Sequence, residues 1–135
     1  MKKYLLFFLC VSLISLAQPR ISAHRGNTGR APENTLATYK NALKLRVNFI
    51  EIDVRTSADG KLIILHDGTL NRTTTGEGPV KNQAFSELKK LSAGKEHAGF
   101  EKEKIPSLKE VCELISRWNI WHSKKTFIYV DCKEV

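Results

Sequence analysis

The chain has 135 residues, with 22 Lys and Arg against 14 Asp and Glu, a formal net charge of +8 and 41% hydrophobic residues. This length suits one domain, and the apolar content is high enough for a packed core, which excludes a wholly disordered chain. The basic excess would suit an anionic substrate or peripheral contact with a membrane surface. No run of Lys and Arg is interleaved with aromatic residues, so we expect no nucleic-acid partner.

Residues 1–17 have the features of a secretory signal. Lys2 and Lys3 precede an apolar run over Tyr4–Leu16, and Ser15-Leu16-Ala17 offers small residues for cleavage. The run is short for a transmembrane helix. We therefore expect a cleaved signal peptide at 1–17, one domain at 18–135, and export to the periplasm or the extracellular space.

The apolar pattern of the remaining chain predicts strands alternating with helices. The expected strands lie at 20–24, 49–55, 61–66 and 126–133. The expected helices lie at 36–45, capped by Asn34 or Thr35, and after Pro106, with one or two helical turns around 85–91. This order predicts an α/β fold with mainly parallel strand pairing and covering helices.

Two cysteines, Cys112 and Cys132, follow the expected signal peptide, and their spacing is not that of a metal site. Export would permit a disulfide between them. We favour two buried thiols, because both residues fall on apolar faces of their expected elements.

Carboxylates stand together on the second expected strand. Glu51 and Asp53 are two positions apart, so both side chains leave the same face of that strand. Two carboxylates held on a rigid strand suit a divalent cation. Asp131 and Lys133 share a face of the last strand in the same way. The competing interpretation is that these carboxylates only form ion pairs with Arg25, Arg55 or Lys133.

Histidines end the strands on either side of this pair in the sequence. His24 follows the first strand and His66 ends the third. Histidine exchanges protons near neutral pH, so two of them beside a cation site suit general acid and base catalysis. A single histidine at the end of a strand would more often be structural. The combination predicts an enzyme whose site lies at the carboxyl ends of the strands.

A series of short motifs carries a family resemblance. It comprises Ala23-His-Arg-Gly26, Ala31-Pro-Glu-Asn-Thr35, Ile50-Glu-Ile-Asp-Val54, Asp59-Gly60, His66-Asp67, Leu70-Asn-Arg-Thr-Thr74, Gly76-Glu-Gly78 and Ile105-Pro-Ser-Leu108. In this order and spacing the series resembles the glycerophosphodiester phosphodiesterase family. The resemblance implies a TIM (β/α)8 barrel, a fold of roughly 250 residues. The chain would then cover roughly the first four strands, half of the barrel, either as a fragment of a longer chain or as the product of a truncated gene.

The resemblance also implies an activity, the hydrolysis of glycerophosphodiesters, small molecules, to glycerol 3-phosphate and an alcohol. It implies His24 and His66 as the acid/base pair, Glu51, Asp53 and Asp131 as ligands of Ca²⁺ or Mg²⁺, Arg25 and Lys133 as phosphate contacts, and Glu33 as a glycerol contact or a brace for Arg25. Two positions depart from the family. Asp131-Cys-Lys133 stands where the family has Glu-x-Lys, and Arg46 or Val47 where it has a glycine.

Two other functions stay open. The same site could serve a phospholipase acting on lysolipids, which an exposed aromatic rim would favour; we interpret the candidates, Trp118 and Trp121, as helix packing. If the chain were complete, four strands could not close a barrel, and an exposed edge strand would remain. The protein would then be an inactive remnant, a binding module or half of a dimeric barrel, and the reading frame beyond Val135 would discriminate.

Overall fold

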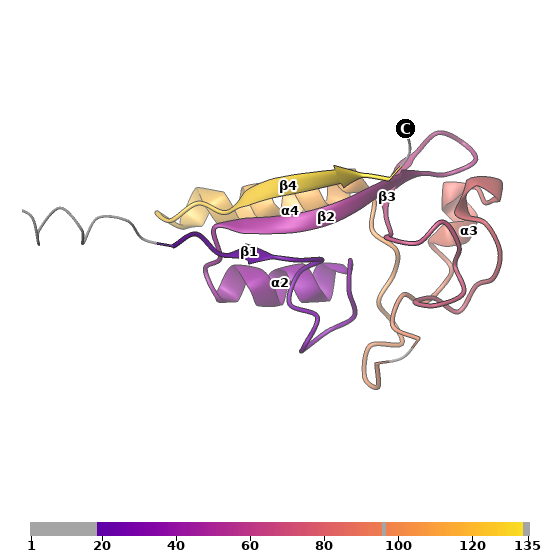
Figure 1. The fold of residues 1–135 in the computed structure, drawn as a ribbon, viewed down its shortest axis with the longest axis horizontal. Coiled ribbons are helices and arrows are strands. Elements are labelled where there is room, and N and C mark those ends of the chain that lie inside the picture. Colours follow the sequence, from indigo (N-terminus) through magenta and orange to yellow (C-terminus); the bar gives the residue numbers. More distant parts are fainter. Residues whose placement is uncertain (1–18, 96, 134–135) are drawn as a thin grey trace, which may run out of the picture.

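The computed structural model describes residues 19–95 and 97–133, and Figure 1 shows their arrangement. The expected signal peptide at 1–17 lies outside the described residues. Within the described part of the chain, no helix is both long enough and apolar enough to span a membrane.

The central strand of the sheet is β2 (Phe49–Thr56). Both β1 (Ser22–Ala23) and β4 (Phe127–Cys132) run parallel to it. They lie on opposite edges, because Ile50 pairs with Ala23 on one side and with Ile128 on the other. The expected strands at 20–24, 49–55 and 126–133 are thus confirmed, with the first one shorter than expected.

The third strand, β3 (Leu62–Ile64), pairs antiparallel to the end of β2, with Val54 opposite Ile64. This strand is the exception to the mainly parallel pairing that the sequence predicts. The connection is a tight turn in which Ser57 N donates to Lys61 O at 2.9 Å and Gly60 has a φ of 75°. A parallel return would need a crossover of a dozen or more residues. Three strands are therefore parallel, and β3 extends β2 as a hairpin.

Helices α2 (Leu36–Lys44) and α4 (Leu108–Trp121) cover one face of the sheet (Figure 1). The side chain of Thr35 accepts a hydrogen bond from Thr38 N and begins α2, and Ser107 forms a capping box with Glu110 at the start of α4. Their apolar stripes and the covered face of the sheet form the main core: Tyr39, Ala42, Leu43, Val47, Ile50, Ile52, Val54, Ile64, Val111 and Ile115.

A smaller core lies under the long segment between β3 and α4. This segment holds a 3₁₀ turn, η1 (Val80–Asn82), and the short helix α3 (Phe85–Leu88), which is the helical turn expected around 85–91. The buried side chains of this core are Ile63, Leu65, Leu70, Val80, Leu88, Ala93 and Ile105.

Both cysteines are exposed and free, so the expectation of buried thiols is wrong. On α4 the buried stripe passes through Val111 and Ile115, and Cys112 is turned about 100° from Val111. Ile128 of β4 packs against the core, but Val130 is 46% exposed. Cys132 lies on the same side as these two residues and beyond the part of β4 that is covered.

Candidate active site at the carboxyl ends of the strands

Three carboxylates meet on the face of the sheet that α2 and α4 leave uncovered. Strand register pairs Asp53 with Asp131, and Glu51 precedes Asp53 by two residues on the same face. One oxygen from each lies within 4.8 Å of the other two. Asp53 and Glu51 are buried, and Asp131 is partly exposed. An all-oxygen donor set of this kind fits a hard divalent cation such as Ca²⁺ or Mg²⁺.

Lys133 lies between two of these carboxylates. Its Nζ is 2.5 Å from Asp131 Oδ2 and 2.9 Å from Asp53 Oδ1. The hydrogen bonds to Asp131 and Asp53 raise the pKa of Lys133. Burial alone would raise the pKa of Asp53, but hydrogen bonds from Asn34 and Lys133 outweigh it and lower that pKa. Asp53 is therefore an anion at neutral pH although it is buried.

Arg25 approaches the same carboxylates from the loop after β1. Its backbone N donates to Glu51 Oε2 at 2.7 Å, and its Nε lies 3.4 Å from Asp53 Oδ2. Its Nη1 donates to Glu33 Oε1 at 3.2 Å. Arg25 has a φ of 53°, a left-handed conformation that is uncommon outside glycine. The loop thus holds a strained residue whose backbone and side chain both contact site carboxylates.

Asn34 has a role that the sequence did not reveal. It is buried, and its Nδ2 donates to Asp53 Oδ2 at 2.6 Å. Its Oδ1 accepts from Tyr39 Oη at 2.8 Å. Thr35, not Asn34, caps α2. The sequence did contain a hint of this role: a helix needs one capping residue, so Asn34 beside Thr35 was free for another contact. Asparagine also tolerates the left-handed φ of 57° that Asn34 adopts.

A chain of polar contacts begins at His66. Its Nδ1 lies 2.7 Å from Asp67 Oδ1, and Asp67 accepts hydrogen bonds from Arg72 Nε and Nη2 at 2.7 and 2.9 Å. Arg72 also donates through Nη1 and Nη2 to Glu33, at 2.9 and 2.8 Å. The hydrogen bond from Arg72, followed by that from His66, holds the pKa of Asp67 well below its usual range. The pKa of Glu33 is lowered too, chiefly by its hydrogen bond with Arg72.

Asp67 and Arg72 belong to the sequence motifs, but the motifs alone did not indicate a role for either residue. Asp67 follows the candidate histidine directly, which was a usable signal. Arg72 is 39 residues from Glu33, so only the folded loops bring the two together. The network fixes the His66 ring through Nδ1, which leaves Nε2 as the nitrogen able to exchange a proton with a ligand.

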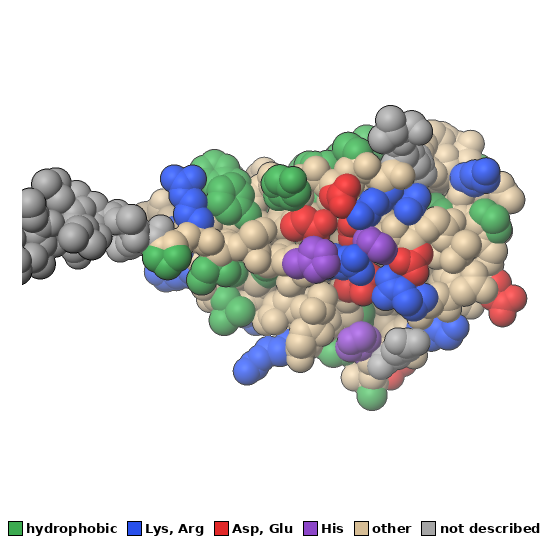
Figure 2. Space-filling model, viewed as in Figure 1, with side chains coloured by type: hydrophobic (Ala, Val, Ile, Leu, Met, Phe, Trp, Pro, Cys, Tyr) green, Lys and Arg blue, Asp and Glu red, His purple; other side chains and the backbone are tan. Residues whose placement is uncertain are grey.

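His24 directly follows β1 and is exposed. It lines a hollow of about 390 Å³ together with Ser22, Phe49, Glu51 and Tyr129. Figure 2 shows histidine, acidic and basic side chains gathered in the middle of this face of the molecule. The structure thus brings together all eight residues expected in the site: His24, Arg25, Glu33, Glu51, Asp53, His66, Asp131 and Lys133.

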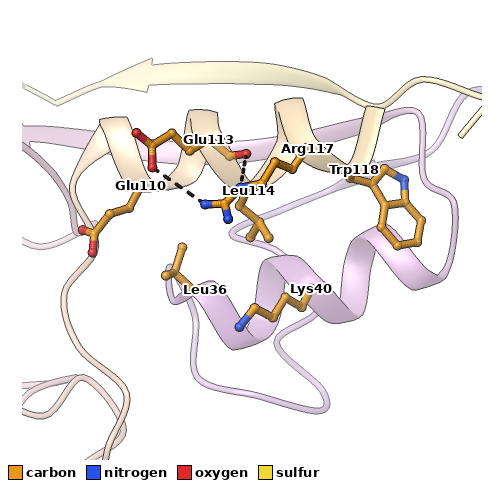
Figure 3. Close-up of a pocket in the computed structure, with 7 residues that line it drawn as sticks. All are labelled: Leu36, Lys40, Glu110, Glu113, Leu114, Arg117 and Trp118. Atoms are coloured by element: carbon orange, nitrogen blue, oxygen red, sulfur yellow. Dashed lines mark hydrogen bonds and ion pairs between the residues drawn. The ribbon is translucent and has the colours of Figure 1, made fainter. Parts of the chain in front are cut away.

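A larger hollow, of about 510 Å³, lies elsewhere, between α2 and α4. Figure 3 shows aliphatic side chains at its base and an Arg117–Glu113 ion pair on α4 at its rim. None of the eight site residues lines it. It is a groove between covering helices on the opposite face of the sheet from the carboxylates.

Comparison with known proteins identifies the family. Residues 24–128 match the model of the glycerophosphoryl diester phosphodiesterase family. The chain belongs to this family. The match ends before Asp131, which strand register places beside Asp53, and before Lys133, whose Nζ lies 2.9 Å from Asp53 Oδ1.

Relatives from distant organisms share this assignment. A glycerophosphodiester phosphodiesterase of Caldanaerobacter subterraneus is 49% identical over 70% of this chain and 40% of its own. Glycerophosphodiester phosphodiesterase 1 of Homo sapiens is 41% identical over 67% of this chain and 29% of its own. The chain therefore spans less than half the length of these relatives.

Solved structures of the family confirm the fold. A phosphodiesterase from Oleispira antarctica, in complex with the product sn-glycerol-3-phosphate, gives a TM-score of 0.78 and 39% identity over 85% of this chain and 44% of its own. A glycerophosphodiester phosphodiesterase from Agrobacterium tumefaciens gives a TM-score of 0.77 and 37% identity over 85% of this chain and 47% of its own. The described residues thus form about half of the family's TIM barrel.

Proposed function

We propose that the protein is a divalent-cation-dependent phosphodiesterase that hydrolyses glycerophosphodiesters to glycerol 3-phosphate and an alcohol. The observation that carries the proposal is the meeting of Glu51, Asp53 and Asp131 within 4.8 Å, beside strand-end histidines. Family membership and the product bound to the Oleispira relative support it. Activity is proposed, and not taken from membership, because the chain spans less than half of these relatives.

The carboxylate group would hold the cation, Ca²⁺ or Mg²⁺. The site already attracts positive charge, since Lys133 Nζ and Arg25 Nε lie 2.9 and 3.4 Å from Asp53. A cation bound there would neutralise charge on the phosphate oxygens of the substrate. Arg25 would add forked hydrogen bonds to the phosphate, and Lys133 a point charge.

His24 and His66 would carry the protons. One takes the proton of the glycerol 2-hydroxyl as that oxygen bonds to phosphorus; the other gives a proton to the alcohol oxygen as its bond to phosphorus breaks. Water then opens the resulting cyclic phosphate with the two roles reversed. His66 is the better oriented of the two, because Asp67 holds its Nδ1 at 2.7 Å.

Glu33 was expected either to contact the glycerol or to brace Arg25. It accepts hydrogen bonds from both Arg25 and Arg72. These contacts support the bracing role, and contact with the glycerol hydroxyls stays a prediction.

The decisive experiment measures glycerol 3-phosphate released from glycerophosphocholine by the full-length protein. We expect EDTA to abolish release and added Ca²⁺ or Mg²⁺ to restore it. His24→Ala and His66→Ala should each lower kcat by about 100-fold or more. His122→Ala is the control, because His122 stacks on Trp118 at the far end of α4. Activity that ignores EDTA would refute the cation; unchanged activity in either site variant would refute the acid/base pair.

A lysolipid is the second candidate substrate. His24 and Glu51 share their hollow with Phe49 and Tyr129, which offer an apolar wall next to the catalytic groups. Lysophosphatidylcholine tested beside glycerophosphocholine separates the two substrates. A higher kcat/KM for the lysolipid would make the protein a phospholipase.

We also propose that residues 1–17 are a signal peptide that is cleaved during export. The apolar run after Lys2 and Lys3 supports this proposal. Mass spectrometry of the protein recovered from its host tests it. A mature chain beginning at Gln18 is expected, and an intact Met1 on the protein in the cytoplasm would contradict it.

A further inference from the structure

Three segments meet at the amino ends of the parallel strands, opposite the candidate active site. They are residues 20–21 before β1, residues 44–48 from the last residue of α2 to the start of β2, and residues 118–127 from the last turn of α4 to the first residue of β4 (Figure 1). Backbone hydrogen bonds join them: Asn48 N donates to Ile21 O at 3.0 Å, and Phe127 N to Asn48 O at 2.9 Å. We call them the amino-end surface.

Large apolar side chains protrude from this surface. Ile21, Leu45, Ile120 and Trp121 are 60, 66, 71 and 83% exposed. The expectation that Trp121 packs within the fold is therefore wrong, whereas Trp118 is partly buried against the core and stacks on His122 at 3.6 Å. Neither Trp118 nor Trp121 forms a rim at the active site, because both lie at the other end of the strands.

Basic residues surround these apolar side chains. The three segments contain Arg20, Lys44, Arg46, Lys124 and Lys125, all exposed, and no Asp or Glu. Figure 2 shows basic and hydrophobic side chains together at this end of the described residues. Lys125 has a structural role, because its Nζ donates to the carbonyls of Asn119 and His122. Packing within the fold does not account for Ile120 and Trp121, whose side chains point away from the core.

We propose that the amino-end surface docks on an anionic phospholipid bilayer. Tryptophan suits the boundary between headgroups and acyl chains, where its ring is buried and its N–H stays hydrated. Each Lys or Arg near an anionic membrane strengthens binding about fivefold. A nucleic acid would use the positive charge but gain nothing from exposed Ile and Leu.

Docking through the amino-end surface would determine how the active site is oriented relative to the bilayer. The carboxylates and histidines lie at the other end of the strands, so they would face the aqueous phase and not the bilayer. If the proposed function holds, the enzyme would take its substrate from solution, which favours a soluble glycerophosphodiester over a lysolipid embedded in the same membrane. The docking proposal itself needs no catalytic activity.

The test is flotation of the full-length mature protein, which begins at Gln18, with two kinds of vesicle, phosphatidylcholine alone and phosphatidylcholine with about one third phosphatidylglycerol. We expect binding only to the anionic vesicles, at low salt. Lys44→Gln combined with Lys124→Gln should weaken it about 25-fold. Lys81→Gln combined with Lys102→Gln is the matched control, because both lysines are exposed in the segment between β3 and α4. Because residues 1–17 are absent from all these proteins, the apolar sequence Tyr4–Leu16 does not contribute to the binding that is compared.

Fluorescence supplies the second readout. Vesicle binding should shift the emission of Trp121 to shorter wavelength, and Trp121→Phe, which keeps Trp118, should lose the shift. The proposal is overturned if the two double variants bind equally well. It is also overturned if duplex DNA binds as tightly as the anionic vesicles and the emission of Trp121 does not move with vesicles, since the surface would then bind polyanions in general.

Discussion

Asn34 donates a hydrogen bond of 2.6 Å to Asp53, from the start of α2 to the middle of the site. The donor stands in a left-handed conformation, with a φ of 57°, and its other amide atom accepts the Tyr39 hydroxyl at 2.8 Å. Both partners of this bond are buried. The bond therefore fixes one oxygen of Asp53. Because Asn34 is itself held by Tyr39 of α2, the position of α2 determines how the Asp53 carboxylate is oriented.

Asn34→Gly should remove the side-chain amide without changing the backbone conformation, because glycine adopts the same φ without strain. Losing a hydrogen bond to a buried carboxylate should cost about 1.5–3 kcal/mol of unfolding free energy and raise the pKa of Asp53. Calcium titration calorimetry of the full-length protein should show weaker binding. Asn41→Gly on α2 is the control: it should lower stability by about 0.3–0.5 kcal/mol and leave calcium affinity unchanged. Unchanged affinity in Asn34→Gly would mean that Asp53 is oriented without it.

Arg72→Gln should alter the dependence of stability on pH. The pKa values of Asp67 and Glu33 are lowered in the fold, first by their hydrogen bonds with Arg72. The folded protein then binds fewer protons than the unfolded chain in acid, so these groups stabilise it fully above about pH 5 and lose that effect as pH falls. Urea unfolding at neutral and acid pH should show a smaller loss in Arg72→Gln. An equal loss would exclude Arg72 as the source of the shifts.

Substitutions of Asp131 would show whether an Asp in place of the family's Glu changes cation affinity. Asp131→Asn should weaken cation affinity by about tenfold or more and leave the fold intact. Asp131→Glu should keep or improve the affinity. Activity of the full-length protein is measured against Ca²⁺ and Mg²⁺ concentration for both variants. If neither curve moves, Asp131 is only the ion-pair partner of Lys133, 2.5 Å away.

Gly26→Ala should distort the loop that carries His24 and Arg25. Gly26 has a φ of 89°, and a Cβ there would lie 2.4 Å from Thr38 Cγ2 on α2. The loop or the helix must shift, which we expect to lower the melting temperature and the activity together. Gly29→Ala, in the same loop, is the matched control, because a Cβ there meets nothing within 4 Å. A melting temperature unchanged in Gly26→Ala would mean that the loop adapts freely.

The local part of this structure could be predicted from the sequence. Glu51 and Asp53 share a face because strand side chains alternate, and the helical stripe that follows Asn34 and Thr35 predicts a helix capped by one of these two residues. The motifs around His24 and His66 identified the family, which the comparisons confirm. The roles of the two histidines stay predictions. All of these features depend on neighbours within a few residues, and short-range geometry is what a sequence displays directly.

Tertiary structure alone decided the rest. Register across β2 and β4 places Asp131 beside Asp53, and no local pattern specifies a pairing across 78 residues. The same is true of Arg72, which joins Glu33 to Asp67 only because two loops fold over the same strand ends. The sequence was consistent with Asn34 as a helix cap, but in the folded protein its amide is buried and donates to Asp53. The sequence by itself determined which chemical groups the site contains, and packing decided which of them touch, because contacts between distant segments depend on how the whole sheet and its helices fit together.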